Sequence, residues 1–261
     1  MHFTSFEKMR SIRDTYVPSG AKVLDVGSAT FGGPTYRDLF GRGYEYVGLD
    51  IEDGNNVDLA VKDAYQWVEL DDDSFDVAIS GQAFEHNPFF WITAAEMARV
   101  VRPGGIIAII APARGHVHRY PVDCWRFFPD SWVALADYIG LELEETYLEP
   151  AGSRVKVGGV LWGDSVLVAR KPRFAGDDER DAFHARLAAI RATATATFPD
   201  DVVLAVGPAM SDYRDRLTVD GLAWRRVQLI NLAKTCARLA KNRGKKLLKL
   251  PEDRFERRVD V

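Results

Sequence analysis

The chain has 261 residues, of which 47% are hydrophobic, and a formal net charge of −4. These values are ordinary for a soluble protein and allow one large domain with an appendage. The longest apolar stretch, around residues 104–113, is far shorter than the roughly 20 residues that a membrane helix needs, so no transmembrane helix is expected. Two cysteines are too few for a disulfide framework, and residues 1–14 lack the apolar core of a signal peptide. A cytoplasmic location is therefore expected.

Apolar runs of strand length alternate with helical stretches, a pattern that predicts a parallel sheet with covering helices. The expected strands cover, in chain order, residues 22–26, 46–50, 57–59, 75–80 and 106–111, followed by a closing antiparallel pair at 143–148 and 165–169. The clearest helix covers residues 91–101, and Gly104 and Gly105 are expected to end it. The predicted fold class is α/β, a Rossmann-like, doubly wound and mostly parallel seven-stranded sheet.

The composition changes after residue 171, where the chain becomes charged and rich in alanine. We expect one domain over residues 1–171 and a helical C-terminal extension over 172–261, with helices at 178–195 and 222–241. Residues 1–221 carry 22 basic and 34 acidic residues, whereas residues 222–250 carry nine basic and no acidic ones. The basic helix is expected to dock by its apolar face. Its basic side would attract an anionic membrane surface, RNA or, as favoured here, the acidic remainder of its own chain.

The segment VLDVGSATFGG at residues 23–33 predicts a buried strand followed by a tight glycine turn. Gly27 lets the backbone turn sharply near a ligand, and Asp50, at the end of the next apolar run, can accept hydrogen bonds from ribose hydroxyls. A dinucleotide and S-adenosylmethionine both fit this arrangement, and the glycines do not separate them. Asp25 favours S-adenosylmethionine, because its anion would repel a pyrophosphate and attract the cationic amino-acid part of the methyl donor.

Several motifs in the right order make residues 20–171 resemble a class I S-adenosylmethionine-dependent methyltransferase. The matching segments are VLDVGSAT, YVGLDI, VKDAYQWVELDDDSFDVAIS, SGQAFEHNP and EMARVVRPGGIIAIIAP. The resemblance implies S-adenosylmethionine as the cofactor, with adenine between Asp63 and Ala64. The implied cofactor-binding residues are Asp25, Gly27, Ser28, Asp50, Ile51, Asp63, Ala64, Gln82 and His86. Ala29 and Phe31 replace the usual second and third glycines of the first motif, so a longer loop is expected.

Each of these assignments has a structural alternative. Asp25 could cap a neighbouring helix, and Asp63 could serve as a helix N-cap, since an Asp before Ala often does so. The side chain of His86 could pack the loop without lining the cofactor. The place of Asp25 and Asp50 within the motifs favours the binding role for both.

The acceptor side is expected at residues 113–132, ARGHVHRYPVDCWRFFPDSW, directly after the fifth strand. Ligands of open parallel sheets bind outside the carboxyl ends of the strands, so this loop should border the cleft. Methyl transfer to a hydroxyl needs alignment of the reacting atoms and a base for the hydroxyl proton. His118 oriented by Asp123 is the preferred catalytic pair, and His116 is the reserve. The spacing of His116, His118 and Asp123 matches no standard zinc pattern, so no metal site is predicted.

The same loop resembles a pattern in bacterial methyltransferases of polysaccharide and glycan assembly, which implies a sugar hydroxyl as acceptor. The residues that carry the resemblance are His118, Tyr120, Pro121, Asp123, Trp125, Arg126 and Phe127. Sugar faces stack on aromatic rings while the hydroxyls bond to polar side chains. The expected substrate-binding residues are Arg119, Tyr120, Trp125 and Arg126. The alternative is structural, with WRFF packing the loop and Arg126 paired to Asp123.

Nucleic acid is the competing substrate class. The chain has no Pro-Pro pair, as an exocyclic amine methyltransferase would need, and no Pro-Cys pair, as a base-carbon methyltransferase would need. Base methylation is therefore not expected. The predicted function is O-methylation of a saccharide hydroxyl. The alternatives are methylation of a small natural product or phenol, a cofactor-binding scaffold without turnover, and a nicotinamide oxidoreductase.

Overall fold

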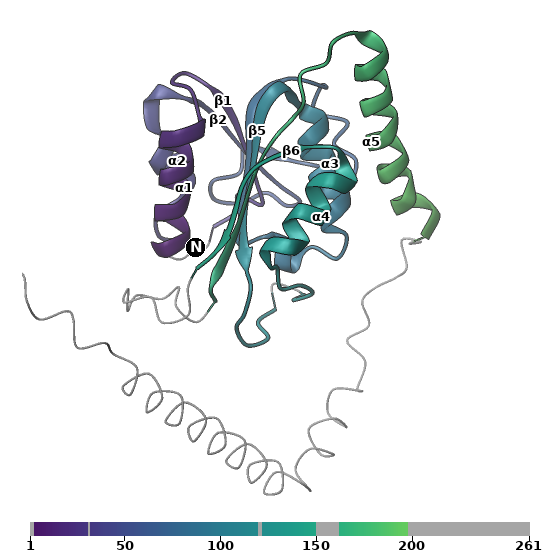
Figure 1. The fold of residues 1–261 in the computed structure, drawn as a ribbon. Coiled ribbons are helices and arrows are strands. Elements are labelled where there is room, and N and C mark those ends of the chain that lie inside the picture. The colour runs from purple at the N-terminus through teal and green to yellow at the C-terminus, as the bar shows by residue number, and fades with distance from the viewer. Residues whose placement is uncertain (1–2, 31, 120–121, 150–161, 198–261) are drawn as a thin grey trace, which may run out of the picture. The chain divides into compact units, whose positions relative to one another are not determined.

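The computed structural model describes residues 3–30, 32–119, 122–149 and 162–197. Its centre is a seven-stranded sheet in the order β3-β2-β1-β4-β5-β7-β6 (Figure 1). The strands are β1 (Lys22–Val26), β2 (Glu45–Asp50), β3 (Leu59–Ala60), β4 (Phe75–Gly81), β5 (Val101–Pro112), β6 (Glu142–Leu148) and β7 (Asp164–Arg170). The helices are α1 (Phe3–Tyr16), α2 (Tyr36–Phe40), α3 (Phe90–Val100), α4 (Pro129–Ile139) and α5 (Asp177–Thr197), with short 3₁₀ turns η1 (Gly41–Gly43) and η2 (Phe84–His86). The predicted α/β fold class is confirmed.

Strands β1 to β5 are parallel to one another, and β7 is antiparallel to both of its neighbours, β5 and β6. The expected closing antiparallel pair is therefore present. Because β1, β2, β4 and β5 run in the same direction, their carboxyl ends meet at one edge of the sheet. The N-terminal end of antiparallel β7 lies at the same edge. This edge is where the predicted site residues lie.

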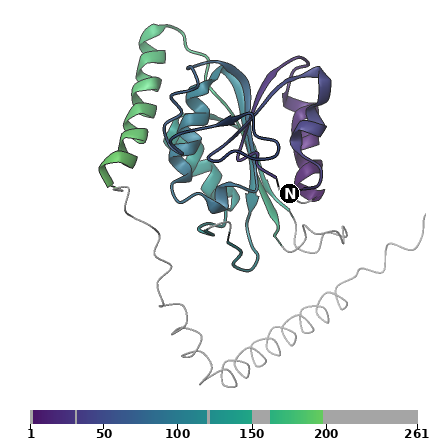
Figure 2. The same cartoon turned by 180° about the vertical axis from the view of Figure 1, so that it is seen from behind.

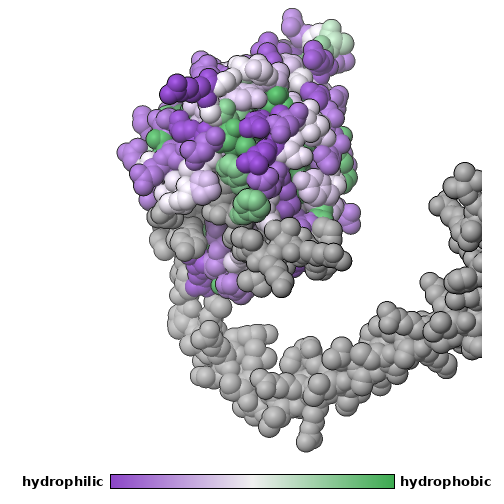
Figure 3. All heavy atoms as spheres, turned by 90° about the vertical axis from the view of Figure 1, so that its left-hand side faces the viewer, coloured by the Kyte–Doolittle hydropathy of each residue, from purple (hydrophilic) through white to green (hydrophobic). Residues whose placement is uncertain are grey.

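Helices cover both faces of the sheet, with α1 and α2 on one face and α3, α4 and α5 on the other (Figures 1 and 2). The alternation of side chains along β1 serves both layers. Val23 packs with Met9 of α1, whereas Leu24 and Val26 belong to the cluster under α3 and α4. Figure 3 shows the outer face of the α1 and α2 layer, where hydrophilic residues predominate and apolar ones are interspersed.

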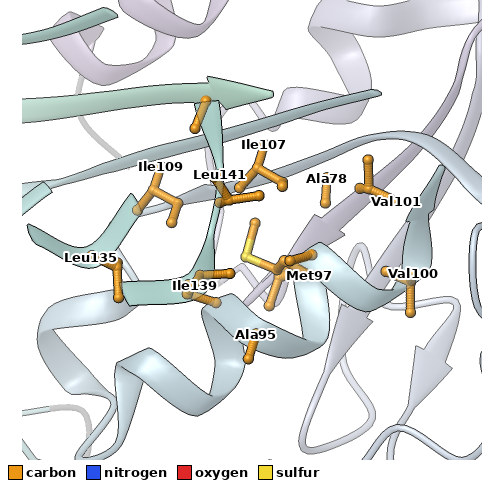
Figure 4. Packing of buried hydrophobic residues seen from close by; sticks show 14 of the residues in the cluster. Ala78, Ala95, Met97, Val100, Val101, Ile107, Ile109, Leu135, Ile139 and Leu141 are labelled. Atoms are coloured by element: carbon orange, nitrogen blue, oxygen red, sulfur yellow. The ribbon is translucent and has the colours of Figure 1, made fainter. Parts of the chain in front are cut away.

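The larger core cluster lies between the sheet and helices α3, α4 and α5. Met97 of α3 lies beside Ile139 of α4, close to Ile107 of β5 (Figure 4). All three side chains are completely buried. The unbranched thioether of methionine suits such a three-element junction, because it adapts to irregular gaps.

The third strand starts later than the predicted residues 57–59. Asn56 adopts a φ of 72°, a left-handed conformation that Asn tolerates in turns. The chain is therefore still turning at residue 57, and the ladder with β2 begins at Leu59, which pairs with Leu49.

The prediction that Gly104 and Gly105 end the preceding helix is wrong. Helix α3 ends at Val100, and β5 begins at the next residue. The two glycines lie inside β5, where its register with β4 shifts. Gly104 has a φ of 80°, and a Cβ on Gly105 would lie 2.6 Å from the carbonyl oxygen of Asp76. The glycines therefore allow a bulge and a close strand contact.

The helix expected at residues 178–195 is present as α5, and its Phe183, Leu187 and Ile190 join the larger core cluster. The helix expected at residues 222–241 and the basic tail lie outside the described residues. The division of the chain at residue 171 stays a prediction. None of the described helices is both long and apolar enough to cross a membrane.

Candidate active site

The turn after β1 forms the base of the cofactor side of the site. Gly27 has a φ of 78°, and a Cβ there would lie 2.5 Å from the Cβ of Ala83. The N–H groups of Gly27 and Ser28 both donate to the carbonyl oxygen of Leu49, at 2.9 and 3.1 Å. The backbone of the first motif is thus held tightly between β2 and the segment that follows β4. A side chain at Gly27 would close this space.

Asp50 ends β2 and joins two turns. Its Oδ2 accepts from the N–H of Ala29 at 2.9 Å, and its Oδ1 accepts from the N–H of Ile51 at 2.7 Å. Each carboxylate oxygen can accept more than one hydrogen bond, so the pair can also receive ribose hydroxyls. Ile51 next to it is 57% exposed and offers an apolar surface at the same edge. Ser28 is buried and its Oγ donates to the carbonyl oxygen of Asn56 at 3.1 Å.

Asp25 lies within β1, beneath the turn, and is only 3% exposed. Its carboxyl group accepts a hydrogen bond from the Tyr46 hydroxyl of the neighbouring strand β2. Burial raises the pKa of Asp25 to about 7, against the lowering effect of the Tyr46 hydrogen bond. Within the described residues, the carboxyl group of Asp25 accepts no hydrogen bond from a helix N-terminus. Its attraction for the cationic part of the methyl donor stays a prediction.

Replacing Asp25 by asparagine is expected to stabilise the cofactor-free protein at about pH 8. The pKa of the Asp25 carboxyl group is higher in the folded than in the unfolded protein, so the protonated carboxyl favours folding. This contribution to the free energy of unfolding is fully present below the unfolded pKa and is lost as the pH rises toward the folded pKa. The shift from 3.8 to about 7 corresponds to at most about 4 kcal/mol. Thermal unfolding of both proteins across this pH window measures the difference. A variant that is equally destabilised at all pH values would contradict the expectation.

Asp63 and Ala64 lie in a turn near the carboxyl end of the short strand β3. The exposed Asp63 accepts from the N–H of Tyr65 at 2.7 Å, and the carbonyl oxygen of Ala64 accepts from Trp67 Nε1 at 3.2 Å. Residues 61–74 contain turns and no helix, so Asp63 is not a helix N-cap. Contact of both residues with adenine stays a prediction.

Gln82 leads to residues that the sequence reasoning missed. It has a φ of 61°, and its Nε2 donates to Asp164 Oδ1 at 3.1 Å. The fully buried Asp164, at the start of β7, also accepts from Thr4 Oγ1 at 2.9 Å and from Lys8 Nζ at 3.2 Å. Helix α1 therefore takes part in this edge of the sheet. No motif within residues 3–16 signalled this role.

The segment after β4 and the loop after β5 are held together at η2. The carbonyl oxygen of Glu85 accepts from the N–H groups of Cys124 and Trp125, at 2.7 and 3.2 Å. His86 Nδ1 lies 2.6 Å from the carbonyl oxygen of Val122. The carboxyl group of Glu85 is buried at 1% exposure, and burial raises its pKa to about 8. Residues 122–125 of the loop therefore contact the segment that follows β4 at Glu85 and His86.

His118 and Asp123 lie together in this loop. His118 Nδ1 is 3.4 Å from Asp123 Oδ2, and the His118 N–H donates to the same oxygen at 2.8 Å. Burial of Asp123 raises its pKa, but hydrogen bonds from Arg126 and the His118 backbone outweigh this and hold it at about 2. Burial, followed by the neighbouring His86, lowers the pKa of His118. The structure thus pairs an ionised carboxylate with an imidazole that favours its neutral form.

The side chains of Arg126 and Trp125 differ in how much of their surface is available to contact a substrate. Both terminal nitrogens of Arg126 donate to the two oxygens of Asp123, and Nη2 also donates to the carbonyl oxygen of His116 at 3.0 Å. This geometry matches the structural alternative for Arg126. Trp125 is 39% exposed, with its ring packed edge-on to Phe90 at 5.3 Å between centroids. Its exposed part is available as a stacking surface.

The remaining loop residues are placed as follows. Phe127 is buried and stacks on Trp132 at 4.4 Å, as the structural alternative expects. His116 is exposed and lies 4.8 Å from the Trp162 ring, while His118 lies 4.2 Å from it. Arg119 is exposed. Tyr120 lies outside the described residues.

Comparison with known proteins gives one family match. The family model described as a methyltransferase domain matches residues 24–109. An uncharacterized methyltransferase of Mycobacterium ulcerans (strain Agy99) is 33% identical over 116 residues, covering 38% of this chain and 44% of that protein. One of Mycobacterium avium (strain 104) is 30% identical over 115 residues with the same coverage. The chain thus spans less than half the length of the curated relatives that it matches.

Solved structures with a similar fold include an S-adenosylmethionine-dependent methyltransferase of Methanosarcina mazei, with a TM-score of 0.48 and 17% identity over 62% of this chain and 98% of that chain. Another is the 1,6-didemethyltoxoflavin-N1-methyltransferase of Burkholderia thailandensis with bound S-adenosylhomocysteine, with a TM-score of 0.49 and 18% identity over 64% of this chain and 78% of that chain.

The matched segment runs from β1 to β5 and contains the turn, Asp50 and the segment after β4. Residues 24–109 of the chain are therefore similar to a methyltransferase domain. S-adenosylmethionine is the cofactor that such a domain uses. Binding of its nucleoside part at the turn of Gly27 and the carboxylate of Asp50 stays a prediction.

Proposed function

We propose that the protein transfers the methyl group of S-adenosylmethionine to a hydroxyl group of a saccharide. The observation that carries the proposal is the contact between two segments at the carboxyl edge of the sheet. Glu85 and His86 follow β4 on the cofactor side, and Val122 to Trp125, in the loop of His118 and Asp123, are hydrogen-bonded to them. This contact supports a proposal in which the cofactor and the proton-accepting pair lie side by side.

The cofactor-binding roles follow from the positions of the side chains. Asp50 would accept the ribose hydroxyls, while Asp63 and Ala64 would flank the adenine. Gly27 and Ser28 would pass beneath the nucleoside, and Gln82 and His86 would line the methionine side. When bound, S-adenosylmethionine supplies an electrophilic methyl group on a sulfonium.

His118 is proposed to remove the proton of the acceptor hydroxyl. Its Nδ1 faces Asp123, which leaves Nε2 to take up the proton. The ionised Asp123 would stabilise the imidazolium that forms, and Arg126 holds Asp123 in place. His116 is the reserve base in this loop.

A saccharide acceptor is supported by the exposed part of Trp125 and by the loop's resemblance to glycan methyltransferases. The flat ring can stack on a sugar face, with Arg119 and Tyr120 as further substrate-binding candidates. Arg126 would contribute mainly by shaping the loop. The cytoplasm is the proposed location, on the ground that the chain has only two cysteines.

Incubation with labelled S-adenosylmethionine tests the proposal. The acceptor panel should contain oligosaccharides, phenols and single-stranded RNA, and mass spectrometry should locate the label. A labelled sugar hydroxyl is the expected product. Label on a phenol alone would show that the acceptor is a phenol and not a saccharide. Absence of any labelled product, with normal binding of S-adenosylhomocysteine, would favour a cofactor-binding scaffold.

Replacing Asp50 by alanine is expected to weaken binding of S-adenosylhomocysteine by about 10- to 100-fold, since hydrogen bonds to charged groups contribute about 1.5–3 kcal/mol. Calorimetric titration measures the change. Asp53→Ala, three residues further along, is a control for removing an exposed acidic group from the same region. Unchanged affinity in Asp50→Ala would contradict the ribose assignment.

A further inference from the structure

Three potential metal ligands meet where η2 contacts the loop after β5. Glu85, His86 and His118 each offer one ligand atom, and these atoms all lie within 4.8 Å of one another. The first two residues follow β4, whereas His118 follows β5, and the sheet brings the two segments to the same edge. Two imidazoles and one carboxylate form a common set of ligands for zinc and related ions.

The surroundings of the Glu85 carboxyl group indicate that it binds a ligand. It is only 1% exposed, and within the described part of the chain neither of its oxygens has a hydrogen-bond partner on another residue. Burying such a group without a partner is costly. The neighbouring cation, Arg126, donates instead to Asp123. His86 Nε2 lies 3.7 Å from Glu85 Oε1.

Both histidines are oriented by their other ring nitrogen, as metal-binding histidines usually are. His86 Nδ1 lies 2.6 Å from the carbonyl oxygen of Val122, so it must carry the proton, which leaves the lone pair on Nε2. That is the nitrogen that faces Glu85. His118 Nδ1 faces Asp123 Oδ2 at 3.4 Å, a longer contact than that of His86. Its Nε2 is then the nitrogen with a lone pair.

We propose that Glu85, His86 and His118 bind a divalent transition-metal ion, with the ligand set of a catalytic rather than a structural site. Three protein ligands leave at least one coordination position for water or for an oxygen of a ligand. The site lies on the proposed acceptor side of the sheet edge. In the metal-bound protein His118 is a ligand and not the free base, so the two roles exclude each other in one molecule. The acceptor hydroxyl would then bind the ion through its oxygen and release its proton to water.

Cobalt binding tests the site without any need for activity. The full chain, stripped of metal with a chelator, should be titrated with Co²⁺ and followed by its visible absorption, and Zn²⁺ should then displace the Co²⁺. One equivalent of Co²⁺ is expected to bind. Glu85→Gln and His86→Asn are each expected to weaken binding at least about tenfold, the lower end of the effect seen even for residues that only support metal ligands.

Two histidine variants serve as matched controls. His116→Asn removes the other histidine of the loop, and His184→Asn removes one on α5, 3.2 Å from Asp72. Both are expected to retain Co²⁺ affinity. Circular dichroism melting should show that every variant is folded.

The proposal is overturned if the wild type binds no Co²⁺, if Glu85→Gln and His86→Asn bind it as tightly as the wild type, or if His116→Asn abolishes binding. The experiments distinguish failure of the metal site from failure of the proposed activity. Full methyl transfer by metal-free protein that also binds no Co²⁺ would remove the metal site only. Tight Co²⁺ binding without any methyl transfer would remove the activity only.

Discussion

Replacing Glu96 by alanine is expected to lower the free energy of unfolding by about 3–5 kcal/mol. Glu96 of α3 is completely buried and contacts three partner groups. It accepts from Arg99 Nη2 at 2.7 Å and from the N–H of Trp67 at 3.0 Å, and it forms an ion pair with Arg191 Nη1 at 2.8 Å. Its removal leaves buried donors without an acceptor and breaks the link between α3, the segment after β3 and α5.

Chemical denaturation followed by circular dichroism measures this loss. Glu45→Ala is the matched control, because Glu45 also forms an ion pair, with Lys22 at 3.3 Å, but is 65% exposed. Exposed pairs contribute at most about 1 kcal/mol, so the control should change stability little. Equal effects of the two substitutions would show that Glu96 does not anchor these elements.

Replacing His118 by alanine is expected to lower the methyl-transfer turnover by about 100- to 10,000-fold, the range typical of a lost general base. Binding of S-adenosylhomocysteine should remain near normal, because His118 lies on the acceptor side of the site. Turnover with saturating acceptor and calorimetry with the cofactor product measure the two effects.

The control for this substitution is His184→Ala, which removes a histidine remote from the loop. Its turnover should match that of the wild type. Undiminished methylation by His118→Ala would show that the reaction needs His118 neither as a base nor as a metal ligand. A loss of cofactor binding equal to the loss of turnover would instead indicate that the loop is misfolded.

Much of the fold was predictable because its signals are local. Apolar runs of strand length, a glycine turn after the first strand and an acidic residue after the second depend on a few neighbouring residues. The later strands could be predicted for the same reason. The start of the third strand could not, since it depends on the left-handed turn at Asn56. Likewise, Gly104 and Gly105 could not be distinguished from a helix stop, because their role is a contact with β4.

The candidate site was predictable only in part. His118 and Asp123 are five residues apart, so a loop can bring them together without help from the rest of the fold. Arg126 was interpreted as substrate-binding or structural, and its bonds to Asp123 match the structural role. Asp164 could not be predicted from the sequence, because its partners, Thr4 and Gln82, come from distant parts of the chain.

The sequence by itself determined the fold class and the methyl-donor turn, because strand periodicity and glycine backbone freedom act over short stretches of chain. Only the tertiary structure decided which side chains face one another at the sheet edge. It placed Glu85 beside His118, although 33 positions separate them in the sequence. The physical reason is that parallel strands bring their carboxyl ends together, while burial and hydrogen bonding then select the contacts.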